Sequence, residues 1–223
     1  MDQIKNLSQI IAKQSILKQD VYEVTKSSFS EFKLRLDKNI AELRKQIPDS
    51  RVRLILEDKG DFEVHAYIGS DLLVFQMHTN IFSFPKEHGI WKSSYVEEHR
   101  DRAYCGIINI YNFLADSFLQ DRFNDSGFLI GRIFVNCEKH FFIEGRGALG
   151  ILYRDFINQE LRENIIDNII QSAIQHVLKF ELHTPAYSAV NQVSVAQMKM
   201  LSSSLQLKTA KRLGFKFGNE SKE

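Results

Sequence analysis

The chain has 223 residues, of which 43% are hydrophobic, which is enough to bury one large core. It carries 29 lysine and arginine residues against 28 aspartate and glutamate residues, so its net charge is only +1. This balance excludes the strong positive field that draws a protein to nucleic acid or to an anionic membrane.

The N-terminal stretch MDQIKNLSQIIAKQ mixes acidic, amide and lysine side chains with isoleucines, unlike a secretory signal. No apolar run approaches the roughly 20 residues that cross a bilayer. We therefore expect a cytoplasmic protein that does not associate with membranes. Cys105 and Cys137 lie too far apart in sequence to indicate a disulfide framework or a zinc site, so we expect reduced thiols.

Residues 4–47 contain no proline or glycine and repeat apolar side chains at helical spacing. The stripe consists of Ile4, Leu7, Ile11, Leu17, Val21, Val24, Phe32, Leu36, Ile40, Leu43 and Ile47. It predicts one long helix, or two helices separated near KSSFSEF, ending before Pro48. We expect a helical arm over residues 1–47 and a single α+β domain over 48–223. The narrow stripe has two interpretations of equal weight. The helix forms a coiled coil with a partner helix, or it folds back over the chain's own sheet.

Six strand-like segments follow the arm: RVRLILE, FEVHAYI, LLVFQMHTNIFSF, CGIINIYNF, FLIGRIFVN and HFFIE. Tight polar turns join the first three, which predicts an antiparallel meander. The polar segment 86–104 separates the third segment from the fourth. Within it, Ser94 and Glu97 match a capping box and predict the start of a short helix.

A long helix is predicted from about Tyr153 to Leu182, because two apolar rows repeat there at spacings of four. The rows are Ile157, Leu161, Ile165, Ile169, Ala173 and Val177, and Ile166, Ile170, Ile174 and Leu178. A final helix is predicted from about Val193 to Arg212. The expected fold is therefore α+β, an antiparallel sheet of about six strands packed by a long N-terminal helix and two C-terminal helices.

Gly145, Gly147 and Gly150 form the pattern G-x-G-x-x-G between a strand and a helix, with Arg146 inside it. Such a turn can hold a pyrophosphate at a helix N-terminus. A dinucleotide fold also needs a β-α-β unit and an acid about 20 residues further on, whereas here a meander precedes the turn and Asp167 falls within the predicted helix. The pattern thus favours a corner in which the glycines allow positive φ angles and close packing.

Two patches resemble a family of acetyltransferases that use coenzyme A. They are the turn with Gly145 and Gly147, and the segment RLGF at 212–215. The resemblance implies that the turn binds the coenzyme A pyrophosphate. The sequence departs from the family where Phe142 replaces the arginine or glutamine of its pattern, and the helix predicted after the turn is longer than the family's.

The segment KEHGIWKSSYVEEHRDRAY concentrates titratable groups, among them Glu97, Glu98 and His99, together with Trp91. Facing a cavity, these groups would form an acid and base pair or hold a ligand or metal; the alternative is a solvated helix with ion pairs along it. No H-x-x-x-H or C-x-x-C spacing occurs, so we expect no metal site. Whether His65 and His78 share one face of the sheet depends on the strand register, which the sequence leaves open. His88 lies in the same polar segment as Trp91.

The sequence therefore favours a non-catalytic binding or assembly module that joins a second copy or another protein through its N-terminal helix, without a cofactor. The alternative is an acyltransferase that binds coenzyme A at Gly145–Gly150. The basic and aromatic C-terminal stretch KTAKRLGFKF would suit nucleic acid, but the near-neutral total charge argues against that partner.

Overall fold

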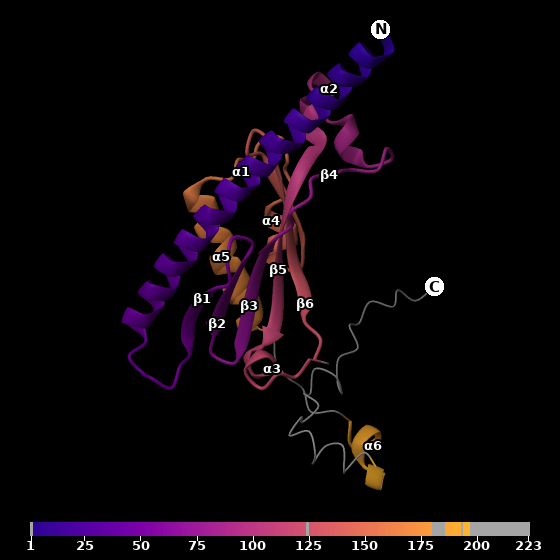
Figure 1. The fold of residues 1–223 in the computed structure, drawn as a ribbon. Helices are drawn as coiled ribbons and strands as arrows, with labels where there is room; N and C mark the ends of the chain where they lie inside the picture. The colour runs from indigo at the N-terminus through magenta and orange to yellow at the C-terminus, as the bar shows by residue number, and fades with distance from the viewer. Residues whose placement is uncertain (1, 124, 180–185, 193, 197–223) are drawn as a thin grey trace.

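The computed structural model describes residues 2–123, 125–179, 186–192 and 194–196, which form helices packed on an antiparallel sheet (Figure 1). The helices are α1 (Asp2–Gln46), α2 (Ser94–Glu98), α3 (Ala115–Leu119), α4 (Ala148–Leu152), α5 (Glu163–Leu178) and α6 (Tyr187–Val190), with 3-10 turns η1 (Gly89–Lys92) and η2 (Arg100–Ala103). The strands are β1 (Leu54–Asp58), β2 (Glu63–Ile68), β3 (Asp71–Met77), β4 (Phe82–Ser83), β5 (Tyr104–Leu114), β6 (Phe128–Asn136) and β7 (Phe141–Gly145). The predicted α+β class is confirmed.

The sheet runs in the order β1-β2-β3-β5-β6-β7, and every pair of neighbours is antiparallel. The predicted meander is therefore confirmed. The third predicted segment, LLVFQMHTNIFSF, divides after β3, and its end forms β4, a two-residue strand that pairs with β5. This division gives the sheet seven strands where six were predicted.

One face of the sheet carries the main core, and both α1 and α5 pack against it (Figure 1). Strand alternation supplies the sheet side of this core. Its residues are Val64, Ala66, Ile68, Leu73, Phe75, Met77, Ile108, Ile110, Ile133, Val135, Phe141 and Ile143. The helices contribute Phe29, Phe32, Leu36 and Ile40 from α1, and Ile166, Ile169, Ile170, Ala173, Ile174 and Val177 from α5.

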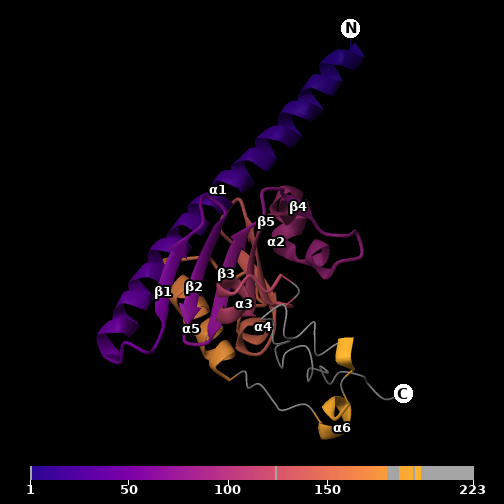
Figure 2. The same ribbon diagram turned by 60° about the horizontal axis from the view of Figure 1, so that its bottom comes forward.

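The N-terminal helix is continuous through KSSFSEF, and its second half folds over the chain's own sheet, as one of the two alternatives predicted. From Val21 to Ile40 one side of the helix is buried, and its side chains Phe29, Phe32, Leu36 and Ile40 pack into the core with the sheet and α5. Residues 2–20, which we call the projecting segment, extend beyond the sheet (Figure 2) and leave large aliphatic side chains exposed. Much of the expected arm is thus part of the core of the domain. The change from exposed to buried apolar side chains along α1 occurs near residue 20.

A polar cluster joins the two long helices at the side of the core. Arg35 of α1 donates from Nε to Oδ1 of Asp167 in α5 at 2.8 Å and also contacts the other oxygen of that carboxylate. Asn39 donates to Oδ1 of Asp167 at 2.8 Å, and Arg35 pairs with Glu163 at 3.0 Å. Asp167, which a dinucleotide site would use to bind a ribose, is therefore occupied in fixing α5 against α1.

The long helix predicted from Tyr153 is wrong over its first ten residues, since α5 begins at Glu163. The Asp155 carboxylate accepts hydrogen bonds from the backbone N–H groups of Ile157 and Asn158, which forms a turn. The segment then lies along β7, where Ile143 N–H donates to the Tyr153 carbonyl at 2.7 Å. Local side-chain capping and pairing with the sheet edge outweigh helical periodicity here.

Two further boundaries differ from the prediction or cannot be compared with it. The N-cap of α2 is Ser93, whose hydroxyl accepts from Val96 N–H, so the predicted capping box of Ser94 and Glu97 is wrong, because the cap lies one residue earlier. The predicted final helix 193–212, the segment RLGF and the stretch KTAKRLGFKF lie outside the described residues, apart from 194–196.

We predict that Phe32→Ala lowers the free energy of unfolding by about 3–5 kcal/mol, because it removes a fully buried ring that packs on Phe75. Leu34→Ala is the control on the same helix, since Leu34 is 49% exposed and should change stability by less than about 0.5 kcal/mol. Urea unfolding followed by circular dichroism measures both. Equal effects of the two changes would contradict the assignment of the buried face of α1.

Candidate functional site

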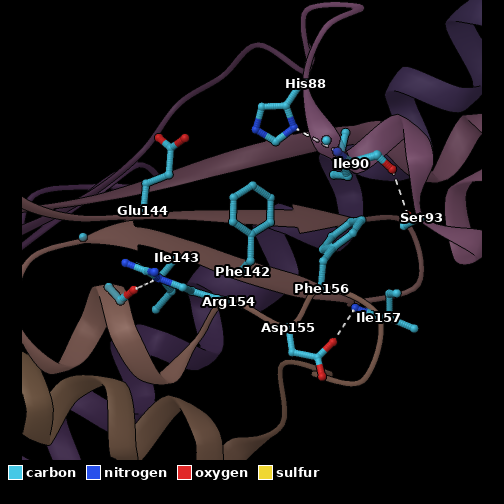
Figure 3. A pocket seen from close by; sticks show the side chains of 13 residues that line it. His88, Ile90, Ser93, Phe142, Ile143, Glu144, Arg154, Asp155, Phe156 and Ile157 are labelled. Atoms are coloured by element: carbon cyan, nitrogen blue, oxygen red, sulfur yellow. Dashed lines mark hydrogen bonds between the residues drawn. The ribbon is translucent and has the colours of Figure 1, made fainter.

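A pocket of about 640 Å³ lies beside the edge strand β7 (Figure 3), where Phe142 points away from the core that contains Phe141 and Ile143. The turn η1 and the residues around it form one wall, and β7 with the segment after α4 forms the other. We call this cavity the aromatic pocket. Its lining includes His88, Phe142, Glu144, Arg154, Asp155 and Phe156, together with Gly145 and Gly150.

A cluster of aromatic rings supports the apolar part of the pocket, and two of its members, Phe142 and Phe156, line the pocket directly. The Phe142 ring lies parallel to Phe134 at a centroid distance of 4.8 Å, and Phe156 approaches it edge-on at 5.5 Å. Phe84 completes this group at 5.1 Å from Phe134 and 5.6 Å from Phe142. These distances lie in the range where aromatic pairs attract one another, so the rings form a fixed surface.

His88 adds a polar group whose neutral tautomer is defined by a hydrogen bond. Its Nδ1 accepts a hydrogen bond from Ile90 N–H at 3.2 Å, so in the neutral ring the proton lies on Nε2. The imidazole stacks on Phe84 at 4.7 Å. His88 thus presents Nε2–H as a hydrogen-bond donor beside the Phe142 ring (Figure 3).

Arg154 and Asp155 are adjacent in sequence but have different roles. Arg154 is an exposed residue that lines the pocket, and it donates from Nε to the Gly150 carbonyl. The Asp155 carboxylate accepts from Ile157 N–H, Asn158 N–H and the Asn158 side chain at 2.9–3.2 Å. Hydrogen bonds from Asn158 lower the pKa of Asp155, whose carboxylate therefore serves as the cap of a turn.

Glu144 is the last member of a polar row that crosses the outer face of the sheet. The strand register places five polar side chains opposite one another: Glu63, Gln76, Asn109, Arg132 and Glu144. Arg132 lies 3.7 Å from the Glu144 carboxylate and donates to Asn109 at 3.4 Å. The negative charge that Glu144 brings to the pocket is therefore opposed by Arg132.

The structure shows that His65 and His78 do not form a common site. His65 is buried and shares a face with Glu63, which it contacts at 2.8 Å, and Gln76 donates to the same carboxylate. His78 follows the end of β3, where its Nδ1 accepts from Asn80 N–H. The two rings thus belong to separate local arrangements.

Packing accounts for the conformation of the glycine turn. A Cβ on Gly150 would lie 1.9 Å from the Gly145 carbonyl oxygen, and one on Gly145 would lie 2.9 Å from the Ile130 oxygen. Gly147 has a φ of 56°. These glycines allow α4, a helix of five residues, to lie directly against β7. Gly145 and Gly150 line the pocket, whereas Arg146 and Gly147 do not.

The other predicted site residues lie away from the pocket lining. Glu97 and Glu98 are exposed on α2, where Glu98 pairs with Arg102 at 3.0 Å, and His99 is exposed where α2 meets η2. The Trp91 indole donates to the carbonyls of Phe84 and Pro85. Glu98 and Trp91 therefore stabilise the polar segment, and the binding roles of all four residues stay predictions.

The ring side chains of the pocket were not predicted as site residues from the sequence. Phe142 and Phe134 alternate with the buried Phe141, Ile143 and Ile133, so strand periodicity places them on the outer face. Phe156 was expected inside a helix. Because its position depends on the turn at Asp155, periodicity alone gives no signal for its approach to Phe142.

Neither chemistry nor similarity assigns this site to a known class. Within the described ranges, no cluster of three or more His, Cys, Asp or Glu side chains is arranged to hold a metal ion. No helix in the same ranges has both the length and the apolar content needed to span a membrane. No family model matches the chain, and neither do curated proteins or solved structures.

The two cysteines are unpaired thiols. Cys105 is buried and Cys137 is half-buried. Burial raises the pKa of each thiol above its ordinary value, which disfavours the reactive thiolate.

We predict that Gly150→Ala destabilises the protein by about 1–3 kcal/mol, because the new methyl group would collide with backbone that cannot move aside. Gly89→Ala is the matched control. Gly89 also lines the pocket, but its added Cβ would meet no atom within 4 Å. Melting temperatures of the two variants measure the difference, and a Gly150→Ala protein as stable as the wild type would contradict the packing role of the turn.

Proposed function

We propose that this chain is a non-catalytic binding module that self-associates through the projecting segment, residues 2–20 of α1. The observation that supports this most strongly is the exposure of five large aliphatic side chains on a helix that leaves the domain. They are Ile4, Leu7, Ile10, Ile11 and Ile16. Four of them lie on one side of the helix, and a contiguous exposed apolar surface of this kind is typical of an interface.

The projecting segment is well suited to pairing because its helix is already nucleated. A helix of this length is marginal in water by itself, since forming its first turn is unfavourable. Here the buried residues from Val21 to Ile40 fix the following half of the same helix in the core. A partner therefore meets an ordered surface and does not have to offset the cost of nucleation.

All of these apolar side chains except Ile16 form one broad stripe, which also includes Leu17. Leu17, Ile10 and Leu7 precede the buried Val21 by about one, three and four turns, so they continue the face that packs on the sheet. Ile4 and Ile11 lie beside Leu7 at spacings of three and four residues. Ile16 falls on the opposite side of the helix.

The charges of the projecting segment are compatible with a second copy of this chain as the partner. Residues 2–20 carry Lys5, Lys13 and Lys18 against Asp2 and Asp20, so two copies meet with little net repulsion. The segment is about 28 Å long at 1.5 Å per residue, or more than two heptads, and the folded domain anchors it at one end.

We predict that the full chain is a dimer and that Leu7→Glu with Ile11→Glu converts it to a monomer, because the two charges would lie in the apolar seam. Ile16→Glu is the matched control: Ile16 is 60% exposed, against 57% for Leu7 and 62% for Ile11, but it lies outside the stripe. Sedimentation velocity at micromolar concentrations measures the mass. A monomeric wild-type chain, or an Ile16→Glu change as disruptive as the pair, would exclude this interface.

Coenzyme A-dependent acyl transfer is a second proposal, favoured by the position of Gly145 and Gly150 in the lining of the aromatic pocket. Against it, α4 has only five residues and the glycines are accounted for by packing. Melting of the protein with acetyl-coenzyme A tests it. A ligand present at 100 times its dissociation constant adds about 2.7 kcal/mol, and no stabilisation would remove the support for this alternative.

A further inference from the structure

We infer that the aromatic pocket binds a small planar aromatic molecule bearing a single carboxylate, with its ring against Phe142 and Phe156 and its carboxylate on Arg154. This site lies on a different part of the molecule from the projecting segment. The inference therefore does not depend on the proposed self-association.

The shape and lining of the pocket favour an aromatic body. Its volume of about 640 Å³ falls in the range of small-molecule sites, roughly 300–1,000 Å³. The rings of Phe142 and Phe156 project into it from two different segments, and Ile90 and Ile157 add aliphatic surface (Figure 3). A planar ring placed there adds a further member to an existing aromatic cluster.

The charges at the pocket leave one cation available. Glu144 is opposed by Arg132 at 3.7 Å, and the Asp155 carboxylate is occupied by its three hydrogen bonds to the turn. Arg154 uses Nε for the Gly150 carbonyl, and no acidic side chain of the described chain forms an ion pair with it. The two terminal nitrogens of its guanidinium suit the two oxygens of a carboxylate.

The neighbouring acids favour a monoanion over a phosphate. Glu144 and Asp155 both line the pocket with Arg154, so a ligand with two negative charges would be repelled more strongly than one with a single charge. His88 supplies Nε2–H to a hydrogen-bond acceptor on the ligand, because its Nδ1 is occupied by Ile90 N–H. The expected ligand is therefore an aromatic carboxylate carrying a further oxygen or nitrogen acceptor.

Calorimetric titration of the full chain tests the assignment with three probes: indole-3-acetate, the neutral indole-3-acetamide, and adenosine monophosphate. We expect the wild type to bind the acetate about tenfold more tightly than the amide, as a charge-assisted hydrogen bond would give. Arg154→Met should bring the two affinities to within about twofold by weakening only the acetate. Arg162→Met is the control, because Arg162 pairs with Glu160 outside the pocket and its loss should preserve the preference.

Two further variants keep the test decisive if Arg154→Met disturbs the turn. Arg154→Lys retains the charge without the planar fork and should leave an intermediate preference. Phe156→Leu should weaken acetate and amide by the same factor, because it removes a ring and no charge. Absence of acetate binding at millimolar concentrations, a preference that survives Arg154→Met, or tighter binding of the monophosphate than of the acetate would each overturn the inference. None of these results bears on self-association, which sedimentation measures separately.

Discussion

The close contact of α1 with the sheet is the constraint on which the rest of the structure depends. Gly106 of β5 lies directly under Thr25 of α1, and a Cβ at Gly106 would be 2.0 Å from the Thr25 hydroxyl oxygen. This contact brings α1 close enough to the sheet for Phe29, Phe32 and the following apolar residues to enter the core. The sheet covers the helix only from about Val21 onwards, so most side chains of the preceding turns are exposed, although Lys13 reaches Asp101 of η2 at 3.9 Å.

The same sheet produces the aromatic pocket on its other face. Alternation along β6 and β7 sends Ile133 and Ile143 towards α1 and α5, and sends Phe134 and Phe142 outwards. The segments before η1 and after α4 then partly cover these rings, while the polar row that ends at Glu144 borders them. One core thus supports two separate surfaces, the projecting segment and the aromatic pocket.

Sequence periodicity was sufficient for the regular elements and failed where side chains cap turns. The alternating pattern of FEVHAYI and the helical spacing of Phe32, Leu36 and Ile40 are intrinsic to single elements, and the structure bears both out. The turn at Asp155 interrupts a good helical pattern because a carboxylate captures two backbone N–H groups. The pocket was not predictable as a unit, since it combines η1, β7 and the segment around Phe156, whose proximity arises only from the tertiary fold.

Hydrogen exchange along α1, followed at several protein concentrations, distinguishes a projecting segment that pairs with a second copy from one that stays single. If the buried half of α1 anchors the helix and its other half pairs with a second copy, the amides of residues 24–43 should exchange only on global unfolding at every concentration. Those of residues 6–20 should become more protected as the concentration rises. Exchange of residues 6–20 that is independent of concentration would contradict the account.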